Sequence, residues 1–148
     1  MSGKTVKTND QRYHMNIHLV FTTRMLLRKL GKEGLEEQFK CTAEDICGRH
    51  EATLLDFEHG IRSENGTSFY TQSAVHIHIH LHGQTAPAEL YKEIKTAFNT
   101  ITSIEDPSKR SIWNNDYYIT DDKYYEPEKA IAFVSERLAK YKPGGRNK

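Results

Sequence analysis

The sequence has little cysteine and no long hydrophobic run, and both absences exclude classes of protein. Only two cysteines, Cys41 and Cys47, occur among 148 residues. Their spacing matches neither a disulfide framework nor a zinc knuckle, so we expect reduced residues in or near a core. No apolar run approaches the roughly 18 residues of a membrane-spanning helix, and no signal peptide is recognised. We therefore predict a cytoplasmic protein without a membrane partner.

A large excess of charge of one sign is also missing. The 21 basic and 20 acidic residues give a net charge of +1, although basic residues cluster at both ends of the chain. The length suits one domain that buries its own core. We predict a basic tail over residues 1–12, a single domain over 13–141 and a second basic tail over 142–148. Such tails are solvated or contact phosphates.

Hydrophobic periodicity and turn signals predict seven main elements. Strands are expected over 15–23, 52–57, 68–82 and 113–120. Helices are expected over 32–49, from about residue 85 to the break at Asp106-Pro107, and from residue 126 onward. The second of these helices carries an apolar stripe of Leu90, Ile94, Phe98 and Ile101. The order β-α-β-β-α-β-α is typical of an α+β, ferredoxin-like (split βαβ) fold. This fold has an antiparallel sheet with helices on one face, and here an additional C-terminal helix.

Four histidines alternate with apolar residues in the run His76-Ile-His78-Ile-His80-Leu-His82. Side chains alternate between the faces of a strand, so the four imidazoles share one face and the apolar residues face the core. His18 joins them if the first and third strands are neighbours. One explanation is a half-buried strand with a polar face. However, half of the eight histidines lie within seven residues, which favours a metal-binding or proton-transferring site.

Several segments together resemble the single-tyrosine transposases of small bacterial insertion sequences, within the HUH nuclease superfamily. Residues 13–24 are similar to the opening strand of that family, and residues 112–118 to its Trp-containing strand. His76-Ile-His78 matches its metal motif, and the segment with Lys92 and Lys95 matches its lysine-bearing helix. The resemblance covers residues 13 to 140.

The resemblance implies a DNA-processing function. Members bind a hairpin of single-stranded DNA and cleave it with a tyrosine that becomes linked to the 5′ phosphate. They hold Mg²⁺ or Mn²⁺ with the histidine pair and a third polar ligand, and they form homodimers that exchange the last helix. We predict His76, His78 and His80 as metal ligands. The predicted nucleic-acid contacts are Arg24, Lys92, Lys95, Arg137 and Lys140, and the ligand is DNA or RNA.

Two positions depart from the family pattern. Phe133 occupies the position of the catalytic tyrosine, and a phenyl ring has no oxygen with which to attack phosphorus. Arg137 stands where the family has a Gln or Asn ligand, and a guanidinium repels a cation. We therefore predict that tyrosine-dependent nicking is altered or lost. Tyr125 and His80 are the remaining candidates for a catalytic group, and Glu136 is a substitute for the third ligand.

Two other function classes fit the histidine run. A tyrosine-independent ribonuclease would use a histidine to remove the 2′-hydroxyl proton, so Phe133 would be no obstacle. A histidine-triad nucleotide hydrolase would use His78, the central histidine of the run 76–80, as its nucleophile. In that family the motif lies near the end of the domain, whereas here some 65 residues follow.

Overall fold

The computed structural model describes residues 12–23, 35–71, 73–105 and 113–140. The predictions for Arg24, for residues 1–11 and for residues 142–148 lie outside these ranges. Within them, no helix is long and apolar enough to cross a membrane.

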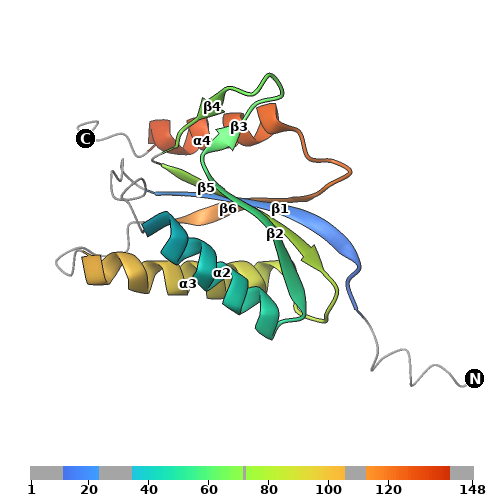
Figure 1. The fold of residues 1–148 in the computed structure, drawn as a ribbon. Coiled ribbons are helices and arrows are strands. Elements are labelled where there is room, and N and C mark those ends of the chain that lie inside the picture. The colour runs from blue at the N-terminus through green and yellow to red at the C-terminus, as the bar shows by residue number, and fades with distance from the viewer. Residues whose placement is uncertain (1–11, 24–34, 72, 106–112, 141–148) are drawn as a thin grey trace, which may run out of the picture.

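Four antiparallel strands form the central sheet, as predicted. They are β1 (Met15–Thr23), β2 (Ala52–His59), β5 (Ala74–Leu81) and β6 (Trp113–Asp121), in the order β2-β5-β1-β6. The helices α2 (Leu35–Arg49) and α3 (Pro87–Glu105) cover one face of this sheet (Figure 1). The third helix, α4 (Pro127–Lys140), lies on the other side of the sheet (Figure 1). The α+β class, the sheet order of the ferredoxin-like fold and the additional C-terminal helix are confirmed.

The main core lies between the sheet and the helices α2 and α3. Trp113 is fully buried there and contacts the rings of Phe21, Phe39 and Phe98. The stripe predicted for the second helix is buried, with Leu90, Ile94, Phe98 and Ile101 all in this core. The prediction for the cysteines holds only for Cys47, which is buried, whereas Cys41 is exposed. Six residues along an α-helix place the two thiols on different faces.

A smaller core joins α4 to the histidine face of the sheet. Ala130 and Val134 of α4 pack against Val20, Ile61 and Ala74. This helix contacts one end of the face, and His78 and His80, farther along β5, remain partly exposed.

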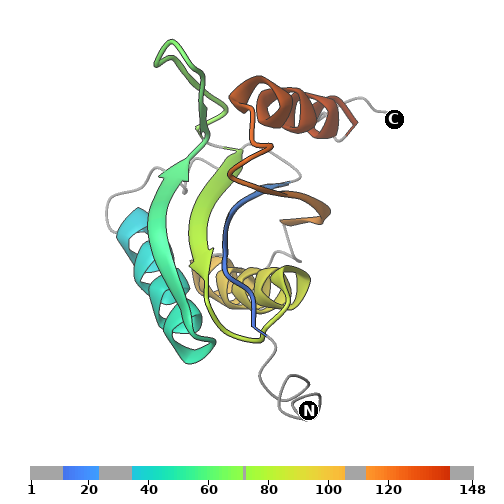
Figure 2. The same cartoon turned by 90° about the vertical axis from the view of Figure 1, so that its right-hand side faces the viewer.

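The single long strand predicted over residues 68–82 is wrong, because a turn divides it. The segments β3 (Ile61–Arg62) and β4 (Ser68–Phe69) form a separate two-stranded sheet, and β5 begins only at Ala74. Figure 2 shows this hairpin beside α4. Tyr70 has a φ of +60°, which is incompatible with a β-strand. The Ser73 amide donates to the Tyr70 carbonyl and closes the turn.

The turn into this hairpin depends on Gly60, and we expect Gly60→Ala to destabilise the fold by about 2 to 3 kcal/mol. Gly60 has a φ of +85°, and a Cβ added there would collide with the Phe69 carbonyl oxygen and the Thr71 backbone. Gly66 is the matched control, because its φ is +92° but a Cβ there meets nothing within 4 Å. Chemical denaturation should give a smaller loss for Gly66→Ala, and equal losses would contradict the packing at Gly60.

Candidate metal centre on the histidine face

Strand pairing places His18 beside the histidine run, as the sequence predicted. In the register of β1 and β5, His18 is opposite His78, Asn16 is opposite His80 and Val20 is opposite His76. All of these side chains point to the face opposite α2 and α3. The register therefore brings His18 into one row with the imidazoles of β5, which lie 58 or more positions away in sequence.

Asp122 completes a group of three possible metal ligands with His18 and His78. It directly follows β6, and its amide donates to the Asn16 carbonyl at 3.1 Å, which fixes the chain beside β1. The Oδ1 atom lies 2.6 Å from His18 Nε2 and 2.8 Å from His78 Nε2. One ligand atom from each residue falls within 4.8 Å of the other two. Two imidazoles and one carboxylate thus converge on a single point.

Ionisation at neutral pH suits His18 and Asp122 for binding a cation. Burial lowers the pKa of His18, so its imidazole is neutral and can donate a lone pair. Burial alone would raise the pKa of Asp122, but hydrogen bonds from Asn16, His18 and His78 outweigh it and lower that pKa. The contact between His18 and Asp122 is therefore a hydrogen bond from a neutral imidazole to a carboxylate. Two nitrogen donors favour a transition ion such as Mn²⁺ over Mg²⁺, which prefers oxygen ligands.

His76 lies behind this group instead of within it. Its Nε2 is 2.9 Å from Nδ1 of His18, and the residue is only 8% exposed. Burial, together with the nearby His18 and His78, lowers the pKa of His76 to about 4. If His18 binds an ion through Nε2, its Nδ1 carries the proton and donates to His76 Nε2. His76 would then orient His18, as the partners of metal-ligating histidines usually do.

His80 also reaches the group indirectly, through Asn16. The Asn16 side chain donates to Asp122 Oδ2 at 3.1 Å, and its Oδ1 lies 2.7 Å from His80 Nδ1. His82 lies beyond the end of β5 and contacts Thr53 at 3.3 Å. Of the three histidines predicted as ligands, His78 is in the group, while His76 and His80 support its other two members.

Tyr125 stacks directly on this site. Its ring centroid lies 3.8 Å from that of His18 with the two planes only 8° apart, and the His18 ring also stacks on His78 at 4.1 Å. Tyr125 also stacks on His76 at 5.2 Å. Burial, and then the charge of Glu58, raises the pKa of Tyr125 to about 12, so the phenol is protonated at neutral pH. Of the two catalytic candidates, Tyr125 contacts His18 directly and His80 reaches the group through Asn16.

Phe133 and Arg137 lie together on α4, against β6. The Phe133 ring packs on Tyr118, and the Arg137 guanidinium lies 4.7 Å above the Phe133 ring. Arg137 forms ion pairs with Asp116 and with Glu136. Lys140 is exposed at the end of the same helix. Arg137, which was predicted to contact phosphate, is therefore already paired with two carboxylates.

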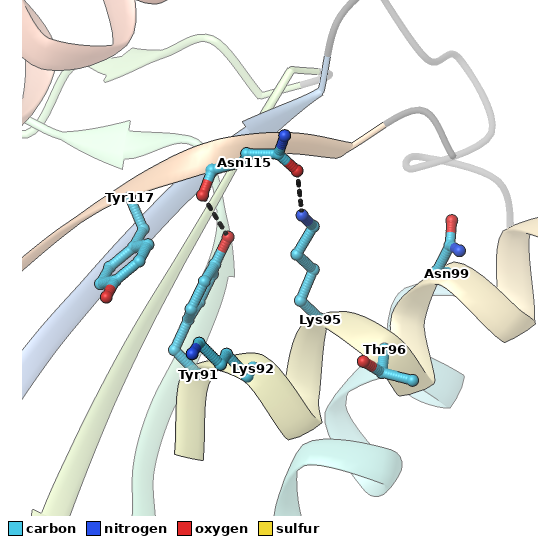
Figure 3. A pocket seen from close by; sticks show the side chains of 7 residues that line it. All are labelled: Tyr91, Lys92, Lys95, Thr96, Asn99, Asn115 and Tyr117. Atoms are coloured by element: carbon cyan, nitrogen blue, oxygen red, sulfur yellow. Dashed lines mark hydrogen bonds between the residues drawn. The ribbon is translucent and has the colours of Figure 1, made fainter. Parts of the chain in front are cut away.

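Lys92 and Lys95 lie on α3, on the other face of the sheet from the histidines. They line a pocket of about 530 Å³ between α3 and β6 (Figure 3). The Lys95 ammonium donates to Asn115 Oδ1 at 2.8 Å. The two predicted groups of site residues therefore belong to two separate places.

Sequence reasoning did not identify Asp122, nor Asn16 as its partner. A signal for Asp122 was present, because two consecutive acidic residues follow the predicted last strand, and the sheet places that strand beside the first. The register that brings it to His18 depends on a β-bulge between β1 and β6, which periodicity does not reveal. Asn16 could have been placed on the histidine face by its alternation with His18.

Comparison with known proteins identifies a shared fold. No protein-family model matches the sequence, and no curated protein matches it significantly. Among solved structures, the chain is similar to a protein from Deinococcus radiodurans described as a "putative transposase". The TM-score is 0.58 and the sequence identity is 17%, over 87% of this chain and 92% of that chain. The fold is shared.

Proposed function

We propose that this chain is a transposase-like domain that binds single-stranded or hairpin DNA, with a divalent metal ion held by His18, His78 and Asp122. The convergence of these three side chains on one sheet face carries the proposal. The similarity to the Deinococcus protein over most of both chains supports it, and favours it over the ribonuclease and histidine-triad alternatives.

The chemistry of the three groups agrees with this role. Two imidazoles and one carboxylate leave further coordination positions for phosphate oxygens. An ion bound there would polarise a phosphodiester and orient it for attack. Asp122 is 45% exposed in its side chain, so a DNA backbone could reach this point without the sheet opening.

We further propose that tyrosine-dependent nicking is altered or lost. Phe133 has no hydroxyl group, and it packs against Tyr118 and Arg137 instead of the histidines. Lys140 adds an exposed positive charge at the end of α4. We propose a homodimer as the functional unit, and sedimentation of the free chain should give twice the monomer mass.

DNA binding should be measured by titrating salt against affinity for a labelled hairpin. We expect binding at low salt that weakens as salt rises, with a slope of about −0.7 to −0.9 for each phosphate contacted. Neutralising Lys140 with Lys140→Gln should reduce that slope, whereas Lys40→Gln on α2, remote from the proposed site, should not. A protein that fails to bind hairpin DNA at low salt would contradict the proposal. Cleavage of an RNA hairpin that stops on 2′-deoxy substitution would instead support the ribonuclease.

A test for a covalent DNA adduct on Tyr125 distinguishes altered nicking from lost nicking. If nicking persists, hairpin DNA incubated with Mn²⁺ should yield a covalent adduct that peptide mass mapping places on Tyr125. The variant Tyr125→Phe should abolish that adduct while it retains Mn²⁺ affinity, because the ring still stacks on His18. An adduct on any other residue would refute the role of Tyr125, and the absence of an adduct in the unmodified chain would indicate loss.

A further inference from the structure

The pocket between α3 and β6 has no part in the metal centre. Adjacent residues of β6 reach opposite faces of the sheet. Tyr117 packs with the main core beneath the sheet, and Tyr118 packs with the smaller core beneath α4. The edge strand β6 therefore separates the pocket from the histidine side of the molecule by the thickness of one strand.

Among the residues that the structure describes, the lining of the pocket is positively charged and contains no carboxylate. It consists of Tyr91, Lys92, Lys95, Thr96, Asn99, Asn115 and Tyr117 (Figure 3). Asp116, the nearest acidic residue on β6, is paired with Arg137 on the other side. An anion that enters the pocket therefore meets two ammonium groups spaced one helical turn apart, a threonine hydroxyl and two side-chain amides.

Two tyrosine rings form the apolar wall of the pocket. The rings of Tyr91 and Tyr117 stack at 3.9 Å with their planes 30° apart. Burial raises the pKa of the Tyr91 hydroxyl, which stays protonated and donates weakly to the carbonyls of Asn114 and Asn115, at 3.5 and 3.4 Å. Tyr91 is only 2% exposed, whereas Tyr117 is half-buried. Tyr91 is thus buried and supports Tyr117 from one side. Tyr117 is the ring that a ligand can reach.

Phosphate-binding ammonium groups beside an accessible aromatic ring are what an unpaired nucleotide requires. A base stacks on an aromatic side chain whatever its identity, and its phosphate is neutralised by lysine. The asparagine amides offer both donors and acceptors, which can match the edge of a base. The volume of about 530 Å³ lies in the range of pockets that hold small molecules.

We propose that this pocket binds one unpaired nucleotide of a DNA strand, with the phosphate beside Lys92 and Lys95 and the base against Tyr117. This inference rests on the proposed DNA-binding function and extends the DNA contact around β6 to the opposite face of the sheet. The nucleotide would be held away from the metal centre, so the pocket would position the strand without taking part in chemistry.

Two measurements on the full chain test the pocket. The first is an NMR titration with a 5′-phosphorylated thymidine dinucleotide, which should shift the Tyr117 ring and the Asn115 side-chain amide and leave His18 and His78 unchanged. The second is hairpin binding by Lys92→Gln/Lys95→Gln, with Lys40→Gln on the exposed surface of α2 as the control. We expect the double variant to bind about 10-fold more weakly, with a salt slope reduced by about 1 to 2. The control should change neither quantity.

A further variant separates base stacking from general attraction between charges. Tyr117→Leu keeps an apolar contact with Tyr91 but removes the accessible ring, and it should bind hairpin DNA about 10-fold more weakly with an unchanged salt slope. The proposal would be refuted if the dinucleotide shifted the histidine signals but not those of Tyr117. It would also be refuted if Lys92→Gln/Lys95→Gln and Tyr117→Leu both bound hairpin DNA as tightly as the unmodified chain. If the dinucleotide shifts Tyr117 while hairpin DNA does not bind at low salt, the proposed function fails and the nucleotide pocket stands.

Discussion

Asp122→Asn is expected to weaken Mn²⁺ binding by about 100-fold or more, or roughly 3 kcal/mol. The substitution keeps the size of the side chain and its hydrogen-bond acceptor but removes the negative charge. Asp122 supplies the only carboxylate in the group, and its oxygen meets both His18 and His78 within 2.8 Å. Isothermal titration calorimetry of the metal-free protein measures this affinity directly.

Asp121 provides the matched control for this substitution. It is the preceding residue, and its carboxylate accepts the Tyr124 amide at 3.0 Å, a bond that an asparagine oxygen can also accept. Asp121→Asn should therefore leave Mn²⁺ affinity unchanged. His76→Gln should weaken binding about 10-fold, because His76 orients His18 without binding the ion. Equal affinities for Asp121→Asn and Asp122→Asn would contradict the assignment of the carboxylate ligand.

The metal-free protein is expected to lose on the order of 3 kcal/mol of stability as the pH falls from about 6.5 to 4 because of His76 alone. Its pKa is about 4 in the folded chain, since burial and the neighbouring His18 and His78 oppose a positive charge. In the unfolded chain the same imidazole takes up a proton near pH 6.5. The unfolded state therefore binds more protons in this window, and stability present above pH 6.5 is lost as the pH decreases.

Substitution of His76 should flatten this dependence. Denaturation of His76→Gln in the presence of a chelator should give a smaller loss of unfolding free energy between pH 6.5 and 4 than the unmodified chain. His18, whose pKa burial also lowers, contributes a loss of the same sign in both proteins. His14 is exposed, so His14→Gln serves as the control and should retain the full slope. A variant His76→Gln with an unchanged slope would show that His76 is not buried as described.

Much of the fold follows from patterns within single segments. Alternation in residues 75–82 predicted both a strand and a shared face for the histidines, and the helical stripe of α3 predicted its buried residues. The turn at Tyr70 was missed because an aromatic residue between β-forming neighbours gives no sign that its φ is positive. Local propensity does not reveal a conformation that the surrounding hairpin imposes.

The candidate site was predicted only in part. His78 and the neighbouring His18 follow from alternation and from the normal strand order of the fold. Asp122 depends on the register between β1 and β6, which includes a bulge, and on a turn that follows the last strand. Tyr125 reaches His18 because that same turn folds back over the sheet before α4 begins. Geometry of this kind is a property of pairing between distant segments, and no spacing within one segment encodes it.

The most direct test of the central claim is a crystal structure of the chain soaked in Mn²⁺, with the ion located by anomalous scattering. We expect one strong peak bonded to Nε2 of His18, Nε2 of His78 and a carboxylate oxygen of Asp122, with His76 hydrogen-bonded to His18 behind it. A peak among His76, His78 and His80 without Asp122, or no peak on the histidine face, would contradict the account.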